Sequence, residues 1–304
     1  MSDHAARLAA LVIGSAAGGG FPQWNCACRL CRLCRAGDKR VRAATQVGIA
    51  VSGDGDEWLL IGASPDLRQQ VLATPALAPR VGRRHSPVAG VVLLSADVDG
   101  IAGVLALREG HRFDLFAPLP ILKVLAANPI FQVLDPALVR RVALAPGEAH
   151  RCGGGLALTL LEMPGKVPLY LEDRAAAAPG EAAAYAARIE AGGRSLVIAP
   201  ACAAITADVR ERLAGAEALF FDGTLYTDDE MRQAGVGTKT GRRMGHVPIT
   251  GPGGSLEFLA GLSGRRIYLH INNTNPILLD GSPERCAVER AGVEVAYDGM
   301  EVRL

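Results

Sequence analysis

Leu11-Val-Ile-Gly-Ser-Ala-Ala-Gly-Gly-Gly20 is the stretch that bears most directly on the fold. Its first three residues predict a short buried strand, and the residues after them predict glycine-rich backbone that ends the strand. The glycines lack the Gly-x-Gly-x-x-Gly spacing, and cysteines follow them where a nucleotide-binding fold would have a helix. The stretch therefore argues against a dinucleotide-binding fold.

Four cysteines follow within the segment Phe21-Pro-Gln-Trp-Asn-Cys-Ala-Cys-Arg-Leu-Cys-Arg-Leu-Cys34. The run Cys26, Cys28 and Cys31 can wrap three thiolates around one ion, because the intervening residues let the backbone turn without strain. Zinc or another thiophilic metal is the predicted guest. The alternative is a set of free or disulfide-bonded cysteines on a loop. The scattered cysteines are expected to pack as small apolar residues: Cys152, Cys202 and Cys286.

The composition indicates a globular protein without a nucleic-acid partner. The chain has 304 residues, 49% of them hydrophobic, and a formal net charge of +1, which gives no general attraction to nucleic acids or acidic membranes. No apolar run reaches the ~18 residues of a membrane span. Residues 5–20 lack the basic leader of an export signal, so we expect a first strand there. The crowded, odd-numbered cysteines fit a reducing, cytoplasmic location.

Turn signals and apolar runs predict two successive sets of strands, each followed by helices. Residues 45–51 and 58–61 predict a β-hairpin, and Val88–Leu94 predicts a strand covered on both faces. Ser64 and Pro65 predict the N-cap and first residue of a helix. We expect a single domain, residues 1–304, with a four-layer αββα sandwich of the α/β (α+β) class. The alternative is an open, doubly wound α/β sheet.

Carboxylate and imidazole groups follow several predicted strands: Asp97, Asp99, Asp222, His246 and His270. Strands that present such groups at one edge of a sheet make a metal or acid–base site. Two imidazoles with carboxylates suit non-haem iron(II), zinc or manganese.

Each of these residues also has a structural interpretation. Asp97 and Asp99 precede a predicted helix, so either could be only an N-cap. His246 and His270 could be histidines satisfied within the core. The three amides of His270-Ile-Asn-Asn-Thr-Asn-Pro276 could orient a ligand, bind a metal, or only form a turn.

With these residues in place, the chain resembles the pyrroloquinoline quinone biosynthesis protein B family, a branch of the metallo-β-lactamase superfamily. The resemblance implies the αββα fold with a metal site at one edge of the sandwich. The matching stretches span nearly the whole chain in order: Gly14-Ser-Ala-Ala-Gly-Gly-Gly-Phe-Pro-Gln-Trp-Asn-Cys-Ala-Cys28, Ala63-Ser-Pro-Asp-Leu-Arg-Gln-Gln70, Ala96-Asp-Val-Asp99, Ala102-Gly-Val-Leu-Ala-Leu-Arg-Glu109, Pro164-Gly-Lys-Val-Pro168, Asp222-Gly-Thr224, Met244-Gly-His-Val-Pro-Ile249, Tyr268-Leu-His-Ile-Asn-Asn-Thr-Asn-Pro-Ile277 and Asp298-Gly-Met300.

The resemblance also implies that the hydrolase site of the superfamily is eroded here. The superfamily motif His-x-His-x-Asp-His falls on Ser95 to Gly100, so Asp97 replaces a histidine and only Asp99 keeps its identity. Later superfamily ligands match Asp222 and His270, and His246 is the other imidazole that could serve. A dinuclear zinc hydrolase is therefore not expected. The residues that remain could hold one metal: Asp97, Asp99, Asp222, His246 and His270.

By resemblance, the expected activity is iron- and dioxygen-dependent hydroxylation of the tyrosine-derived ring of a cross-linked Glu–Tyr precursor of the quinone. The expected partners are that precursor, dioxygen and other proteins of the same pathway, with a homodimer left open. The competing hypotheses are a non-catalytic carrier of the quinone or its precursor towards the periplasm, and a residual hydrolase.

In similar proteins of the family, three cysteines with this spacing bind a structural zinc, and a fourth ligand comes from near the C-terminal histidine motif. In this chain Cys34, Asn273 and His270 are the candidates for that ligand. If zinc takes His270, the residue is not available to iron.

Overall fold

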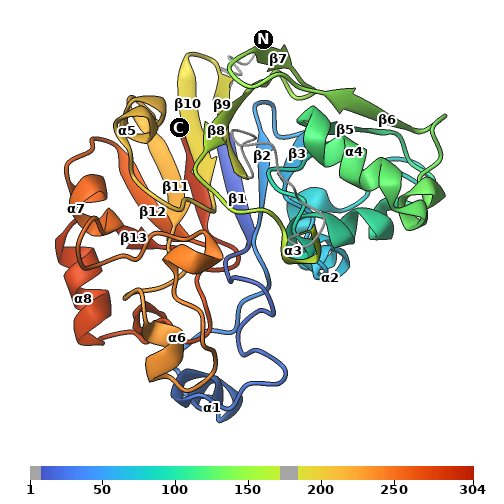
Figure 1. Ribbon diagram of the computed structural model, residues 1–304. Helices are drawn as coiled ribbons and strands as arrows, with labels where there is room; N and C mark the ends of the chain where they lie inside the picture. Colours follow the sequence, from blue (N-terminus) through green and yellow to red (C-terminus); the bar gives the residue numbers. More distant parts are fainter. Residues whose placement is uncertain (1–7, 172–183) are drawn as a thin grey trace.

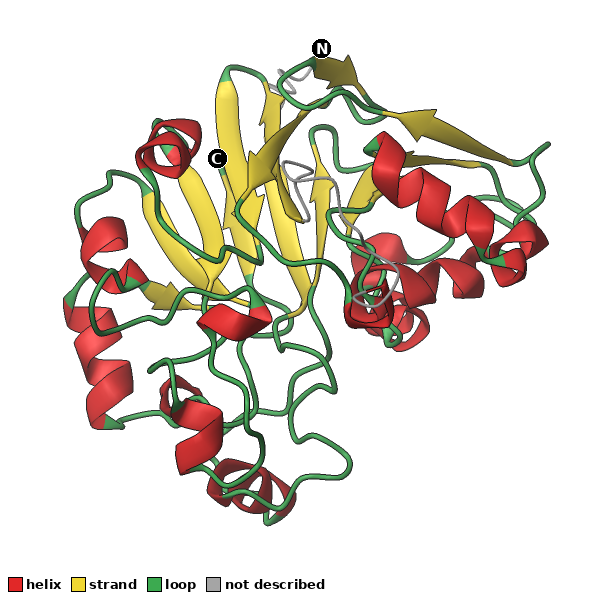
Figure 2. Cartoon of the chain, in the orientation of Figure 1, coloured by secondary structure: helices red, strands yellow, loops and turns green. Residues whose placement is uncertain are grey.

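The computed structural model describes residues 8–171 and 184–304. Within them, two seven-stranded sheets lie face to face, and helices cover the outer sides (Figures 1 and 2). The predicted αββα sandwich is confirmed, and the open doubly wound sheet is wrong because the strands divide between two sheets. The single-domain prediction spans residues 1–304, of which 1–7 and 172–183 lie outside the described residues. Among the described helices, none has the length and apolar character needed to cross a bilayer.

The first sheet has the strand order β14-β1-β2-β3-β4-β5-β6. Pairing is antiparallel from β14 to β3 and parallel from β3 to β6. Its strands are β1 (Ala9–Gly14), β2 (Gly48–Ser52), β3 (Trp58–Ile61), β4 (Val88–Val92), β5 (Phe113–Ala117), β6 (Val139–Ala143) and β14 (Glu301–Arg303).

The second sheet has the order β13-β12-β11-β10-β9-β8-β7 and the same division. It is antiparallel from β7 to β10 and parallel from β10 to β13. Its strands are β7 (Ala149–Arg151), β8 (Ala157–Met163), β9 (Ala184–Ala191), β10 (Arg194–Ala199), β11 (Ala218–Asp222), β12 (Arg265–Leu269) and β13 (Glu294–Val295). Each sheet thus has parallel strands whose carboxyl ends can present loops to one site.

The helices divide between the outer faces and one end of the molecule (Figure 1). The first sheet carries α2 (Leu67–Ala73), α3 (Val98–Ile101) and α4 (Leu119–Ala127), and the second carries α5 (Ala207–Leu213), α7 (Ser255–Ala260) and α8 (Pro283–Arg290). Helices α1 (Arg29–Arg35) and α6 (Glu230–Gln233) lie together beyond the sheets. Short 3₁₀ turns are η1 (Pro75–Leu77), η2 (Ala102–Leu107), η3 (Pro129–Val133), η4 (Leu169–Leu171), η5 (Arg242–Met244) and η6 (Pro276–Leu278).

Strand β11 shows how the sequence builds the layers. Successive side chains of a strand point to opposite faces, so Phe220 packs in the core between the sheets while Phe221 packs on the outer face with Phe258 of α7. Both phenylalanines are fully buried. A continuous apolar run therefore indicates a strand that is covered on both faces.

The glycine-rich stretch after β1 joins the two sheets. Ala16 exchanges backbone hydrogen bonds with the segment before β2, donating to Thr45 O and accepting from Val47 N. One residue on, Ala17 N donates to Ile271 O, directly after β12. The half-buried carboxylate of Asp298 accepts hydrogen bonds from the backbone amides of Ser15 and Thr45 at 2.9 and 2.7 Å and fixes this connection.

Two local predictions need correction. Ser64 is not an N-cap, because α2 begins at Leu67 with Asp66 in the cap position. The buried Ser64 hydroxyl instead lies 3.1 Å from the side-chain oxygen of Gln70. Helix α1 was not predicted within the cysteine segment, where the density of cysteines favoured a loop.

Candidate metal centres

The main candidate site is a pocket of about 390 Å³ at the edge where strands of both sheets end. Asp97 and Asp99, after β4, line it from the first sheet, and His246 and His270 line it from the second. Asp222, the last residue of β11, is fully buried behind the two histidines and does not line the pocket. The structure thus brings all five predicted residues to one region.

Asp222 is held by four hydrogen-bond donors. Its Oδ2 atom accepts from Cys202 N at 2.9 Å and lies 2.8 Å from Nδ1 of His246. Its Oδ1 atom accepts from the amide of Thr224 at 3.1 Å and from the Thr224 hydroxyl at 2.6 Å. This number of donors satisfies a carboxylate that has no solvent contact.

The Thr224 hydroxyl joins both histidines to Asp222. It lies 3.0 Å from Nδ1 of His246 and 2.8 Å from Nδ1 of His270, and the two rings stack with centroids 5.0 Å apart. A carboxylate only accepts, so the hydroxyl donates its one proton to Asp222 and offers lone pairs to the rings. In their neutral forms both imidazoles therefore carry the proton on Nδ1. Their Nε2 lone pairs make no hydrogen bond to any residue within 8–171 and 184–304 and stay available to a ligand in the pocket.

The two histidines differ in their electrostatics. Burial, and then the neighbouring His246, lower the pKa of His270 to about 3, so this ring is neutral. Burial also lowers the pKa of His246, but the Asp222 carboxylate outweighs it and the net shift is upward. His270 has a φ of 59°, a left-handed conformation that costs a non-glycine residue energy and that its surroundings must hold in place. A neutral imidazole in an imposed orientation is the form that binds a metal.

The carboxylates of Asp97 and Asp99 line the same pocket as the histidines. Asp97 has the N-cap position of α3, but its side chain makes no capping hydrogen bond, so the capping interpretation is wrong for this side chain. Burial, and then the charge of Asp97, raise the pKa of Asp99. Gly18 packs against Asp99, and a Cβ atom there would lie 2.2 Å from Oδ2 of Asp99. The glycine-rich stretch therefore gives Asp99 the space that it occupies.

Three side chains that could bind a metal ion lie close together at one side of the pocket. One donor atom each of Asp222, His246 and His270 lies within 4.8 Å of the others. In the described part of the chain, neither Asp97 nor Asp99 belongs to a group that is this tight. Asp222 is already bonded to Nδ1 of His246 and lies behind the rings, so a mononuclear iron(II) or zinc ion would meet the two imidazoles from the pocket side.

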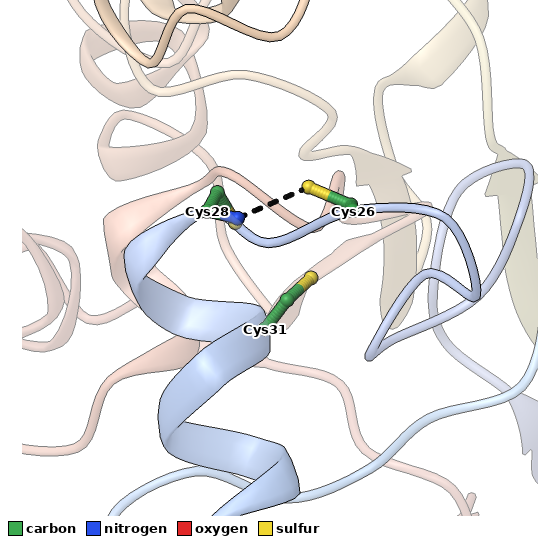
Figure 3. A group of neighbouring side chains, drawn as sticks. All are labelled: Cys26, Cys28 and Cys31. Atoms are coloured by element: carbon green, nitrogen blue, oxygen red, sulfur yellow. Dashed lines mark hydrogen bonds between the residues drawn. The ribbon is translucent and has the colours of Figure 1, made fainter.

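The second candidate centre is formed by the cysteine segment (Figure 3). Cys28 and Cys31 lie three residues apart at the start of α1, and Cys26 folds over them from the preceding loop, with Cys28 N 3.4 Å from its sulfur. The three sulfur atoms lie within 4.8 Å of one another. All seven cysteines of the chain are free thiols, so the disulfide alternative is wrong.

Asn273 closes this group from the opposite side. Its side-chain amide lies 3.1, 3.7 and 3.3 Å from the sulfurs of Cys26, Cys28 and Cys31. Cys34, in the last turn of α1, is not part of the group. Without a metal, burial raises the pKa of the Cys28 thiol to about 11. Here the Asn273 NH₂ group donates to the three sulfurs; turned over, the amide would present Oδ1, and three thiolates with that oxygen fit a closed, tetrahedral zinc site.

Several candidate functional residues were not predicted from the sequence. Thr224 connects the imidazoles, and Lys166 and Lys239 line the pocket. Glu230 of α6 is a buried carboxylate that accepts hydrogen bonds from Tyr226 N and the Thr274 hydroxyl. The one available signal was position, because Thr224, Lys166 and Thr274 all lie within stretches that carried the family resemblance.

The chain is similar in sequence to proteins that share one name. The sequence model described as a β-lactamase superfamily domain matches residues 57–271. "Coenzyme PQQ synthesis protein B" of Methylobacterium nodulans is 54% identical over 297 residues, covering 97% of this chain and 99% of the relative. A relative of the same name from Methylorubrum extorquens is 50% identical, with the same coverage.

Solved structures agree with this assignment. The crystal structure of "Zn(2+)-bound PqqB from Methylobacterium extorquens" superposes with a TM-score of 0.94 at 50% identity, covering 97% of this chain and all of that one. A diphosphatase of the PhnP family has a TM-score of 0.70 at 19% identity, over 98% of this chain and 97% of that one. The second likeness extends to the fold alone.

Proposed function

The chain belongs to the coenzyme PQQ synthesis protein B family within the β-lactamase superfamily, and on this premise we propose that it is a metal-dependent hydroxylase of PQQ biosynthesis. The proposed reaction is iron- and dioxygen-dependent hydroxylation of the tyrosine-derived ring of the cross-linked Glu–Tyr precursor. One oxygen atom enters the ring and the other leaves as water, so the reaction also consumes two electrons from a reductant.

The observation that carries the proposal is the pair of imidazoles with fixed tautomers. Their Nδ1 atoms are engaged by Asp222 and Thr224, so Nε2 of His246 and Nε2 of His270 would bind the metal. Asp222 would orient the rings, as carboxylates behind metal-binding histidines do. Asp99, which lines the same pocket, would complete the ligand set, directly or through water. Bound iron(II) would supply the activation of dioxygen in a site with open positions.

The protein's own residues would handle binding and protons. The apolar wall of the pocket, which includes Val47, Ile61 and Ile198, offers a face for an aromatic ring. Asp97, the other carboxylate of the pocket, would take up the proton that the ring loses on hydroxylation. The absence of histidines at Ser95 and Gly100 weighs against a second metal and therefore against hydrolysis by a bridged hydroxide.

We propose that zinc at Cys26, Cys28 and Cys31 is structural, with Asn273 as the fourth ligand. Such a site leaves no open coordination position for a substrate. It would connect α1 to the segment after β12, which also carries His270. His270 would then remain free for the active-site metal. The relative whose structure superposes best of those described above is itself named as zinc-bound.

We further place the reaction in the cytoplasm, with the precursor and dioxygen as small-molecule partners and other pathway proteins as donors and acceptors of intermediates. The competing role is soluble carriage of the quinone or its precursor, which predicts binding without turnover.

The test is turnover by protein that has been loaded with iron(II) without oxygen and then exposed to air with ascorbate and the precursor. Mass spectrometry should detect the hydroxylated ring with wild-type protein and with Cys34→Ser. It should detect none with His246→Ala or His270→Ala, provided that both variants keep their cysteine-bound zinc. Precursor that binds but is recovered unchanged would support the carrier and overturn the hydroxylase.

A further inference from the structure

Three cations gather where the candidate pocket opens to solvent. Lys166 and Lys239 line the pocket of about 390 Å³, and together with Val167 and Arg243 they also line an adjoining cavity of about 290 Å³. The two lysines are half-buried and Arg243 is exposed. Because the same two lysines belong to both cavities, the smaller cavity is an extension of the larger one.

None of these cations forms an ion pair within the described part of the protein, although Lys166 is close enough to Asp99 to offset in part the rise that burial causes in the pKa of that carboxyl. The ion pairs within residues 8–171 and 184–304 involve other residues, and none joins Lys166, Lys239 or Arg243 to a carboxylate. The smaller cavity has no acidic residue in its lining. Three neighbouring cations without an ion-pair partner repel one another, and an anion in the smaller cavity would relieve that repulsion.

The backbone is shaped to bring Lys166 to this position. Gly245 has a φ of 86°, and a Cβ atom there would lie 3.0 Å from Cγ of Lys166. A side chain at position 245 would therefore meet both an unfavourable backbone conformation and the Lys166 side chain. The same turn carries His246 into the pocket, so one loop places the lysine beside the imidazole.

The acidic residues are thus confined to the larger pocket, whereas the cations extend beyond it. Asp97 and Asp99 line only the larger pocket, and the two lysines line both it and the smaller cavity. A substrate carboxylate is repelled from the aspartates and attracted to the lysines. An aromatic ring with carboxylate substituents would therefore enter with its ring towards the histidines and its carboxylates towards Lys166 and Lys239.

We propose that Lys166, Lys239 and Arg243 form a carboxylate-binding subsite, which selects aromatic substrates that carry two or more carboxylates and sets the end of the molecule that reaches the metal. The inference rests on the proposed function for its substrate class. It assigns a binding role to three residues and needs no chemistry at the metal.

Binding can be measured without turnover by using pyrroloquinoline quinone itself, a tricarboxylate, as the probe. Its trimethyl ester has the same ring system without the charges. Lys166→Gln/Lys239→Gln should bind the acid roughly 10- to 100-fold more weakly than wild type, because two charge-assisted contacts are lost. Binding of the ester should change by less than about twofold, because the apolar contacts remain. Lys123→Gln, an exposed lysine on α4, is the matched control and should bind both as wild type does.

Several outcomes decide between this inference and the proposed function. Equal affinity of wild type and the double variant for the acid would overturn the subsite, and so would wild-type protein that binds the ester as tightly as the acid or binds neither. Tight acid binding with the expected losses, but no hydroxylation of the precursor, would keep the subsite and reject the hydroxylase. Turnover in which the double variant keeps its KM would reject the subsite alone. Unchanged zinc content and melting temperature show that the variants are folded.

Discussion

Thr224 contributes one hydroxyl group, yet that group decides which nitrogen of each histidine faces the pocket. Its proton goes to Asp222, its lone pairs face Nδ1 of both rings, and Nε2 of both rings is left for a ligand. The chemistry of the site therefore depends on Thr224 and on Asp222, which lies behind the imidazoles and does not line the pocket. This is the usual relation between metal ligands and the residues that orient them.

Asp222→Asn tests this relation. The amide NH₂ of asparagine would donate to Nδ1 of His246, and the ring proton would move to Nε2, which could then no longer bind a metal. We expect iron(II) affinity to fall by roughly 10- to 100-fold, as it does when such orienting groups are replaced. Anaerobic iron titration measures it. Asp114→Asn on β5, whose carboxylate pairs with Arg140 at the surface, is the control. Unchanged iron affinity in Asp222→Asn would contradict the orienting role.

Gly18→Ala tests whether the glycine-rich stretch shapes the active site. The new methyl group would overlap Oδ2 of Asp99 and push that carboxylate aside. We expect kcat for the precursor to fall at least about 10-fold, while the unfolding free energy changes by less than about 1 kcal/mol because the displaced group is the end of a side chain. Gly261→Ala, whose new methyl group meets atoms no closer than 3.6 Å, should leave kcat unchanged. If Gly18→Ala were fully active, kcat would not depend on the observed position of the Asp99 carboxylate.

Some residues of the site could be predicted from the sequence, and others could not, because they lie on different kinds of segment. Asp222 and His270 directly follow apolar strands, so their convergence at one edge followed from the sheet alone. Thr224 and Lys166 lie on loops, whose paths depend on contacts with distant segments. The tautomers of the histidines could not be predicted from the sequence either, because they follow from distances of 2.6 to 3.0 Å among side chains.

The cysteine segment is an element stabilised mainly by its own small cluster. Phe21, Leu30, Cys31 and Leu279 are buried in this cluster, which is separate from the two main cores. A cluster of this size stabilises little by itself, so the metal would supply much of the local folding energy.

Cys31→Ser and Cys34→Ser form a matched pair on α1. Cys31→Ser should lose its bound zinc and several degrees of melting temperature, because one of three thiolates is removed from a closed site. Cys34→Ser should keep one equivalent of zinc, because this thiol lies outside the group. Elemental analysis and calorimetry measure both effects. Zinc loss from Cys34→Ser would make Cys34 the fourth ligand and would remove Asn273 from that role.

Glu230 connects α6 to Thr274, in the segment after β12 that also carries His270 and Asn273. Burial raises the pKa of this carboxyl from 4.5 to about 7, and its hydrogen bonds from Thr274 and Tyr226 only partly offset that effect. The folded state therefore favours protonated Glu230. This contribution to stability is fully present below pH 4.5 and is lost as the pH rises through about 7.

Glu230→Gln should therefore abolish part of the pH dependence of stability. Between about pH 4.5 and 7 the unfolding free energy of wild type should fall relative to the variant, by up to about 3 kcal/mol. Urea denaturation at several pH values measures the difference. A constant difference across this range would mean that Glu230 titrates normally in the folded protein.

Strands were predicted better than helices, because apolar runs and turns are local signals. The strand at residues 58–61 was predicted with its observed bounds, whereas α2 begins at Leu67, two residues after the predicted Pro65. The Ser64 side chain found a partner in Gln70 and so did not cap the helix. Tertiary contacts override local preference in this way wherever a polar residue is buried.

At the scale of the whole molecule, the two sheets repeat one plan. Each has three antiparallel pairings followed by three parallel ones, and the parallel halves end at the pocket. The glycine-rich stretch binds the two halves together beside that pocket. The division into two sheets was predictable from the order of strands and helices. The connection that the glycine-rich stretch makes between them was not predictable, because it uses backbone hydrogen bonds between residues far apart in sequence.

The most direct test of the proposed hydroxylase is the origin of the oxygen atom in the product. Iron-loaded wild-type protein would be given the Glu–Tyr precursor, ascorbate and dioxygen labelled with heavy oxygen, in unlabelled water. We predict a hydroxylated ring that carries the heavy isotope, with no such product from His270→Ala. An unmodified precursor, or a product whose new oxygen comes from water, would contradict the assignment of this pocket as an oxygenase site.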